Sequence, residues 1–135
     1  MAKNRRRILV ADDEDYLLNI ICHSLEWYGF EVEKAENGEE ALSILKNAKR
    51  PFDVLITDFN MPVMNGEALI RAIYREGLVL KGIILCSGGN RNPNSTEIED
   101  FLAEFIHAIP FRFVPKPFGP PDLLAAIKDV LQIYR

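Results

Sequence analysis

Acidic residues, a hydroxyl and a lysine stand at the ends of short apolar runs that lie far apart in the chain. Asp12 and Asp13 follow the first run, Asp58 ends another, Ser87 ends a third, and Lys116 closely follows the last. Short apolar runs of this kind are typical of buried strands. Burying a carboxylate without a partner is costly. We therefore expect these groups to compensate one another or to bind a ligand that does.

Three carboxylates brought close together need positive charge, because like charges repel and some would otherwise hold a proton. Lys116 supplies one positive charge. A hard divalent cation with oxygen ligands best supplies the rest. The protein ligands are too few for a calcium cage, and no histidine or cysteine converges on them as zinc would require. The pattern therefore predicts Mg²⁺, for which Mn²⁺ could substitute.

A cation beside Lys116 would also hold a phosphoryl group. One carboxylate could then act as a nucleophile and form an acyl phosphate. Asp58 is the candidate because its strand is expected in the middle of the sheet, whereas Asp12 and Asp13 share one strand end and suit the metal. Catalysis of this kind depends mainly on positioning and charge neutralisation.

The elements that must position these residues alternate regularly. Strands are expected at 8–11, 30–35, 54–56, 82–86 and 111–114, and helices around 17–25, 41–48, 69–73, 98–109 and 123–134. Such alternation predicts an α/β fold with a parallel sheet covered on both faces. Right-handed crossovers place every strand's carboxyl end at one edge, where ligands bind. A single strand-end aspartate is most often a helix cap, but polar groups at four strand ends favour a site.

Length and composition limit the class of protein. The 135 residues fit one domain, 1–135, which begins with a basic flank, 1–7. The chain is 48% hydrophobic and 27% charged, which argues against wholesale disorder. A net charge of −4 argues against a general nucleic-acid binder. We expect no direct binding of nucleic acid.

The two cysteines and the hydropathy indicate the compartment. Cys22 and Cys86 are far apart and form no CxxC pattern, which suggests a reducing environment. Cys86 is expected to be a small buried residue. No apolar run approaches the roughly 20 residues of a membrane span. The expectation is a cytoplasmic protein without a membrane segment.

At this point the residues resemble a known family. The matching motifs are Asp12-Asp13 after ILVA, Asp58 within LITDFNMPVMNG, Ser87 after IILC, and Lys116-Pro117-Phe118. Over essentially its whole length the chain resembles the receiver domain of two-component response regulators, of the chemotaxis-receiver kind. The resemblance implies a flavodoxin-like, doubly wound (βα)5 fold, a five-stranded parallel sheet with strand order 2-1-3-4-5.

The resemblance also implies roles around the metal. Asp58 would accept a phosphoryl group from a histidine kinase or a histidine phosphotransfer protein. Asp12 and Asp13 would help to bind Mg²⁺. Asp13, Asp58 and the backbone carbonyl of Asn60 would contact the ion most directly.

The remaining roles that the resemblance implies form a switch. Lys116 would pair with a phosphoryl oxygen, and Ser87 would donate a hydrogen bond to the phosphoryl group. Phe113 would move inward as Ser87 shifts. Phosphorylation adds about −1.5 to −2 charge, and the surface of helix 98–109, strand 111–114 and the last helix would change shape for a partner to detect.

Two features depart from the family pattern. The segment between Ser87 and Lys116 is several residues longer than usual, within 88–95 or in the next helix. A tolerated surface insertion and a modified partner surface or mobile lid are both open interpretations. Gly89 stands where the family has a variable side chain. Its lack of a side chain predicts poor screening from water and a short-lived acyl phosphate.

Two rival functions remain open. An Mg²⁺-dependent aspartyl-phosphate phosphohydrolase would need a general acid two residues after Asp58, where Asn60 stands. A receiver-like interaction module that is never phosphorylated would not need the complete acid set. We expect a signalling domain rather than a dedicated enzyme. We expect this domain either to act alone on a downstream protein or to be part of a longer regulator or hybrid kinase with an output domain. Dimerisation is a further possibility.

Overall fold

The computed structural model describes residues 5–87, 100, 103 and 109–132. Within them the expected strands and helices form close to their predicted bounds. They are β1 (Arg7–Ala11), α1 (Asp15–Trp27), β2 (Glu31–Ala35), α2 (Gly38–Asn47), β3 (Val54–Asp58), α3 (Gly66–Arg75), β4 (Gly82–Ser87), β5 (Phe111–Pro115) and α5 (Pro120–Leu131). Segment 88–95, which is longer than the family pattern, lies outside the described residues, and so does the helix predicted at 98–109 except for residues 100, 103 and 109.

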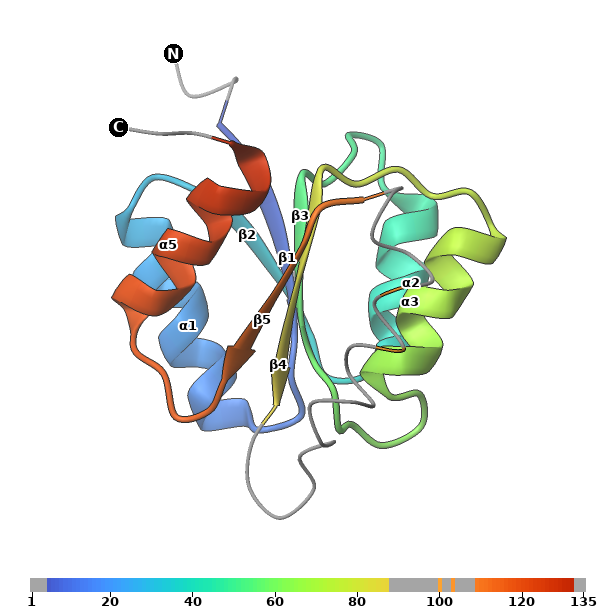
Figure 1. The fold of residues 1–135 in the computed structure, drawn as a ribbon, viewed down its shortest axis with the longest axis horizontal. Coiled ribbons are helices and arrows are strands. Elements are labelled where there is room, and N and C mark those ends of the chain that lie inside the picture. Colours follow the sequence, from blue (N-terminus) through green and yellow to red (C-terminus); the bar gives the residue numbers. More distant parts are fainter. Residues whose placement is uncertain (1–4, 88–99, 101–102, 104–108, 133–135) are drawn as a thin grey trace.

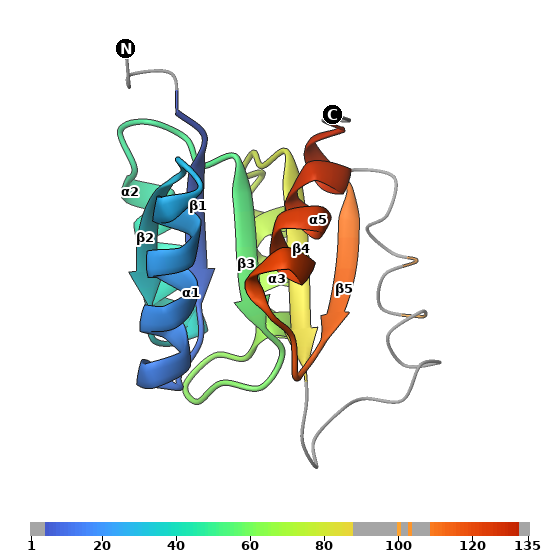
Figure 2. The ribbon, with the colours of Figure 1, turned by 90° about the vertical axis from the view of Figure 1, so that its left-hand side faces the viewer.

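All five strands are parallel and lie in the order β2-β1-β3-β4-β5. This order confirms the five-stranded, flavodoxin-like sheet. β3 is central, as expected, and β2 is an edge strand. In Figure 1 the sheet is seen nearly edge-on, with α1 and α5 on one face and α2 and α3 on the other; Figure 2 shows α1 and α5 in front of the strands.

Alternating side chains of the strands build two cores, one on each face of the sheet. Leu9 and Leu55 pack with the helices α2 and α3, whereas Val10 and Ile56 pack with α1 and α5. Every residue of β3 and β4 is buried. This burial on both faces explains why the central strands are continuous apolar runs rather than alternating ones.

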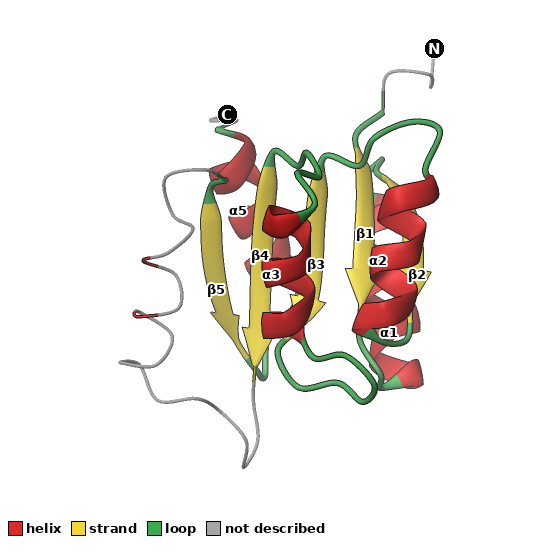
Figure 3. Ribbon diagram, turned by 90° about the vertical axis from the view of Figure 1, so that its right-hand side faces the viewer, coloured by secondary structure: helices red, strands yellow, loops and turns green. Residues whose placement is uncertain are grey.

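The two helices α2 and α3 each begin at a capping asparagine. Asn37 accepts a hydrogen bond from the backbone N–H of Glu40 at 2.8 Å at the start of α2. Asn65 does the same for Ala68 at 2.8 Å at the start of α3. These bonds satisfy amide groups that have no partner inside the helix. In Figure 3 both helices are seen against the sheet. No helix of the described ranges is long and apolar enough to cross a membrane.

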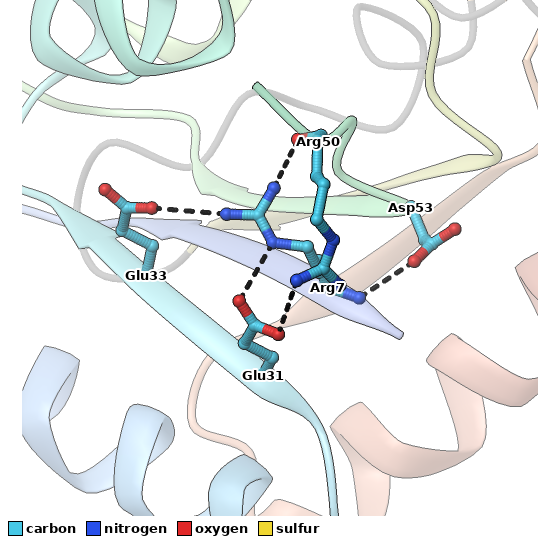
Figure 4. Close-up of polar contacts among 5 residues, drawn as sticks. All are labelled: Arg7, Glu31, Glu33, Arg50 and Asp53. Atoms are coloured by element: carbon cyan, nitrogen blue, oxygen red, sulfur yellow. Dashed lines mark hydrogen bonds and ion pairs between the residues drawn. The ribbon is translucent and has the colours of Figure 1, made fainter. Parts of the chain in front are cut away.

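Arg7 belongs to the fold rather than to a solvated basic flank. It is the first residue of β1, and its side chain is only 13% exposed. Its guanidinium lies 3.1 Å from Glu31 and 3.6 Å from Glu33, both on β2, and donates to the carbonyl of Arg50 (Figure 4). Its backbone N–H donates to Asp53 at 2.8 Å. The basic run therefore contributes a structural cross-link at the amino edge of the sheet, which local charge alone did not indicate.

Candidate active site at the carboxyl edge of the sheet

The opposite edge of the sheet gathers the polar groups that the sequence singled out. The carboxyl ends of β1, β3 and β4 bring Asp12, Asp58 and Ser87 into the interior, where they are 3%, 6% and 0% exposed. Asp13, next along the chain, is exposed. Together with Thr57 these three are the polar residues buried among those that the structure describes. The sheet topology thus assembles the site from segments that are distant in sequence.

Lys116 reaches into this group from the loop after β5. Its Nζ lies 3.2 Å from Asp12 Oδ2 and 3.4 Å from Asp58 Oδ2. Its backbone N–H donates to the carbonyl of Ser87 at 2.7 Å, which joins the ends of β4 and β5. Nζ also lies 3.4 Å from Glu14 Oε1. The lysine is therefore held by its backbone and by three carboxylates.

Asp12, Asp13 and Asp58 could hold a metal ion. Each offers one carboxylate oxygen, and these oxygens lie within 4.8 Å of one another. Both oxygens of Asp12 already accept hydrogen bonds, from the Glu14 backbone N–H at 2.9 Å and from Lys116 at 3.2 Å. A donor set made only of carboxylate oxygens suits a hard divalent cation.

Burial and, to a smaller extent, the negative charge of Asp12 raise the pKa of Asp58 from 3.8 to about 6. Lys116 and a hydrogen bond from the Asn60 backbone oppose this rise. Burial likewise raises the pKa of Asp12. Both carboxylates therefore lack part of the solvation and charge neutralisation that they would have in water, and a bound cation would supply it.

Burial alone would lower the pKa of Lys116. The Asp12 and Asp58 carboxylates outweigh that effect and raise the pKa above its usual value. The side chain is 16% exposed. Lys116 is consequently a fixed positive charge at neutral pH, suited to pairing with an anion rather than to donating a proton.

The loop after β3 is held closely over the site. The Phe59 backbone N–H donates to the Cys86 carbonyl at 2.7 Å, and the Gly66 N–H donates to the Phe59 carbonyl at 2.9 Å. A Cβ atom at Gly66 would lie 2.4 Å from the carbonyl oxygen of Asp58. The glycine therefore permits a backbone approach that no other residue allows.

Cys86 is 2% exposed, and burial raises the pKa of its thiol to about 12. This confirms a small buried residue rather than a reactive thiol.

Two sequence-predicted residues lie at the margin of the site. The Asn60 backbone hydrogen-bonds to the Asp58 carboxylate. Phe113, on β5, is partly buried and packs against the core on the α2 and α3 face.

Beside Lys116, a hollow of about 260 Å³ is lined by Leu17, Lys116, Pro117 and Phe118.

Sequence reasoning gave Glu14 no role at this site. The signal that could have found it is its place directly after Asp12-Asp13, in a row of four acids. A residue at that position follows the carboxyl end of the first strand, and therefore lies at the same edge of the sheet as Lys116. Only the tertiary structure shows that its side chain turns toward the lysine.

The fold and this edge define an α/β domain of the flavodoxin-like kind with an acidic, lysine-flanked crevice. The family model of the response regulator receiver domain matches residues 8–128, and the chain belongs to this family. The resemblance drawn from the motifs is thereby confirmed. Receiver domains are signalling domains of two-component systems, so the coarse functional class follows from membership.

Solved structures agree with this assignment. A CheY-like response regulator receiver domain protein from Methanospirillum hungatei JF-1 has a TM-score of 0.77 at 30% identity, covering 96% of this chain and 95% of that chain. Chemotaxis response regulator CheY4 of Vibrio cholerae has a TM-score of 0.76 at 30% identity, covering 95% of this chain and 100% of that chain.

Curated relatives are longer proteins. The response regulator SaeR of Staphylococcus aureus is 28% identical over 124 residues, which are 92% of this chain and 50% of SaeR. The sensor kinase CckA of Brucella abortus is 29% identical over 126 residues, 93% of this chain and 12% of the kinase. The chain thus spans half or less of the length of these relatives.

Proposed function

We propose that this chain is the phosphoacceptor domain of a two-component or phosphorelay system, and that Asp58 is the residue phosphorylated. One observation carries the proposal. Asp58 is buried at the end of the central strand, 3.4 Å from Lys116 and within 4.8 Å of two further carboxylates. Such a carboxylate is poorly compensated at rest and is surrounded by the groups that bind a phosphoryl group.

The proposed step is a phosphoryl transfer. A carboxylate oxygen of Asp58 attacks the phosphorus of the donor, the bond from phosphorus to the leaving group breaks with its electron pair, and a new P–O bond forms. Lys116 pairs with a phosphoryl oxygen and offsets the added charge. Asp13 and Asp58, with Asp12 behind them and the Asn60 carbonyl beside them, would hold Mg²⁺, which neutralises phosphoryl oxygens when bound.

The proposed donor is a histidine kinase or a histidine phosphotransfer protein, and the proposed readout is a two-state shift. Ser87 is fully buried beside the site, and Phe113 packs on the same sheet one strand away. Ser87 would donate to the phosphoryl group and Phe113 would fill the space it leaves. Phe113 has no hydroxyl, so it can couple only through packing. The surface of β5 and α5, with the helix predicted at 98–109, would then present a new shape to a downstream protein or an output domain.

This function does not make the chain a dedicated enzyme, because its own side chain is the acceptor. We place it in the cytoplasm. Both cysteines are free and buried, which agrees with a reducing compartment.

Intact-mass spectrometry after incubation with acetyl phosphate and Mg²⁺ tests the proposal. We expect one phosphoryl adduct in the wild type, none in Asp58→Asn, and none when a chelator removes the metal. Asp129, on α5, pairs with Arg112 of β5 at the surface. The variant Asp129→Asn is therefore the matched control and should be phosphorylated normally. An adduct that survives Asp58→Asn would exclude Asp58. Fast multiple turnover of phosphate esters would instead indicate a phosphohydrolase, and no adduct in the wild type would favour a module that is never phosphorylated.

A further inference from the structure

Glu14 contacts the lysine of the site instead of capping its own helix. It occupies the N-cap position of α1, where a side chain commonly accepts a hydrogen bond from a first-turn amide, but its side chain forms no such bond. Its Oε1 lies 3.4 Å from Lys116 Nζ, across a separation of 102 residues. The carboxylate is therefore engaged with the site.

The contact completes the set of partners that Lys116 has at rest. A lysine ammonium carries three N–H donors. Three carboxylates surround it, with Asp12 at 3.2 Å and both Asp58 and Glu14 at 3.4 Å. A phosphoryl oxygen can pair fully with Lys116 only after one of these partners withdraws.

Glu14 is the partner that can withdraw at least cost. Its side chain is 65% exposed, whereas those of Asp12 and Asp58 are 4% and 7% exposed. A displaced Glu14 carboxylate is solvated by water, but a displaced Asp12 or Asp58 carboxylate would remain buried without a partner. The Glu14 backbone stays in place, because its N–H donates to Asp12 Oδ1 at 2.9 Å and its carbonyl accepts from Leu18 at 2.8 Å. Only the side chain has to move.

We propose that Glu14 is a positioning residue that holds Lys116 at rest and competes with the incoming phosphoryl group for it. This inference rests on the proposed function. Glu14 thereby slows the phosphorylation of Asp58. Exposed ion pairs are weak, so the competition is expected to change the rate by about two- to fivefold.

Three variants separate the contact from the charge. Glu14→Gln removes the charge, and Glu14→Asp keeps the charge but shortens the side chain by one C–C bond, about 1.5 Å. Asp15→Asn removes the charge of the next residue, which is also exposed. The rate of adduct formation with acetyl phosphate and Mg²⁺ is measured by intact mass. We expect Glu14→Gln and Glu14→Asp to react about two- to fivefold faster than the wild type, and Asp15→Asn to react at the wild-type rate.

Several outcomes would overturn the inference. Equal acceleration in Glu14→Gln and Asp15→Asn would indicate general repulsion of an anionic donor. A wild-type rate in Glu14→Asp would mean that the charge matters and the contact does not. A Glu14→Gln rate equal to or below that of the wild type would exclude competition.

A second measurement works without a phosphoryl donor. Lysine acylation by acetic anhydride is followed by peptide mass spectrometry, with the exposed Lys128 of α5 as the internal reference. Lys116 should be acylated faster relative to Lys128 in Glu14→Gln than in the wild type. An unchanged ratio would refute the contact. If the wild type forms no adduct with acetyl phosphate, the proposed function fails while the lysine ratio still tests Glu14.

Discussion

Replacing Asp58 by asparagine should stabilise the metal-free protein near neutral pH. Asp58 is 6% exposed, and burial together with the Asp12 charge raises its pKa from 3.8 to about 6. At 1.36 kcal/mol per unit, ionised Asp58 costs the folded state about 3 kcal/mol. Asparagine has nearly the same shape without the charge. Lys116 loses one partner but keeps Asp12 and Glu14, so we expect a net gain of about 1–3 kcal/mol.

The pH dependence of this gain has a definite sign. The folded state holds the Asp58 proton more tightly than the unfolded chain does. The stability that this proton contributes is fully present below pH 3.8 and is lost as the pH rises through about 6. The advantage of Asp58→Asn should therefore be small, about 0.5 kcal/mol, near pH 4 and should reach its full size near pH 8.

Urea unfolding followed by circular dichroism, with a chelator present, measures this difference. Asp53→Asn, at the residue directly before the other end of the same strand, provides the contrast. The Asp53 carboxylate accepts the Arg7 backbone N–H at 2.8 Å and lies 3.7 Å from Lys81, so this variant should lose about 1–2 kcal/mol. The reasoning is refuted if Asp58→Asn is no more stable than the wild type near pH 8, or if its gain is the same at both pH values.

Four further predictions concern the same edge of the sheet. Mg²⁺ should raise the melting temperature of the wild type in calorimetry, because it binds preferentially to the folded state. The variant Asp13→Asn should lose most of this rise. If Mg²⁺ raises the melting temperatures of the variant and the wild type equally, Asp13 is excluded as a ligand. Lys116→Met should lower the free energy of unfolding of the metal-free protein by about 3 kcal/mol near pH 8, as measured in urea. The loss should be smaller near pH 4, where the carboxylates take up protons. Equal losses at both pH values would contradict the charge argument. Gly66→Ala places a Cβ 2.4 Å from the Asp58 carbonyl oxygen and should destabilise the protein by about 1–3 kcal/mol, so wild-type stability in thermal unfolding would argue against close packing there. The acyl phosphate should be short-lived, because Gly89 has no side chain to screen the phosphoryl group from water. A half-life of many hours for the Mg²⁺-bound protein would disprove this.

The sequence was most informative where a local pattern has one physical meaning. The apolar run that ends at Asp58 is short and is followed by turn residues, which together favour a strand buried on both faces and a loop after it. Parallel topology then fixes which strand ends meet, so Asp12, Asp58 and Lys116 could be placed together in advance. The strand order, which only the resemblance to the receiver family implied, is also the observed one.

Long-range ion pairs could not be predicted in the same way. Arg7 and Glu14 are charged residues without periodicity, and their partners are many residues away. Arg7 was expected in a basic flank, but it is the first residue of β1, where its backbone pairs with Glu31 and its side chain pairs with Glu31 and Glu33. The place of Glu14 directly after Asp12-Asp13 could have made it a candidate for this edge. Which cation it meets depends on the direction of its side chain, and the sequence does not give that direction.

The Arg7 cross-link gives the two edges of the sheet different mechanical properties. The cross-link joins β1, β2 and the segment before β3 through charges that no phosphoryl transfer would alter. It consists of Arg7, Glu31, Glu33, Arg50 and Asp53 (Figure 4). At the other edge, Lys116 is held by carboxylates, one of which is the proposed acceptor itself. Phosphorylation would thus leave the ion pairs at the amino ends of β1 and β2 intact, and it would change those of Lys116 at the carboxyl edge. A displacement that starts at the acceptor should diminish along the strands and leave the cross-linked end as a fixed reference.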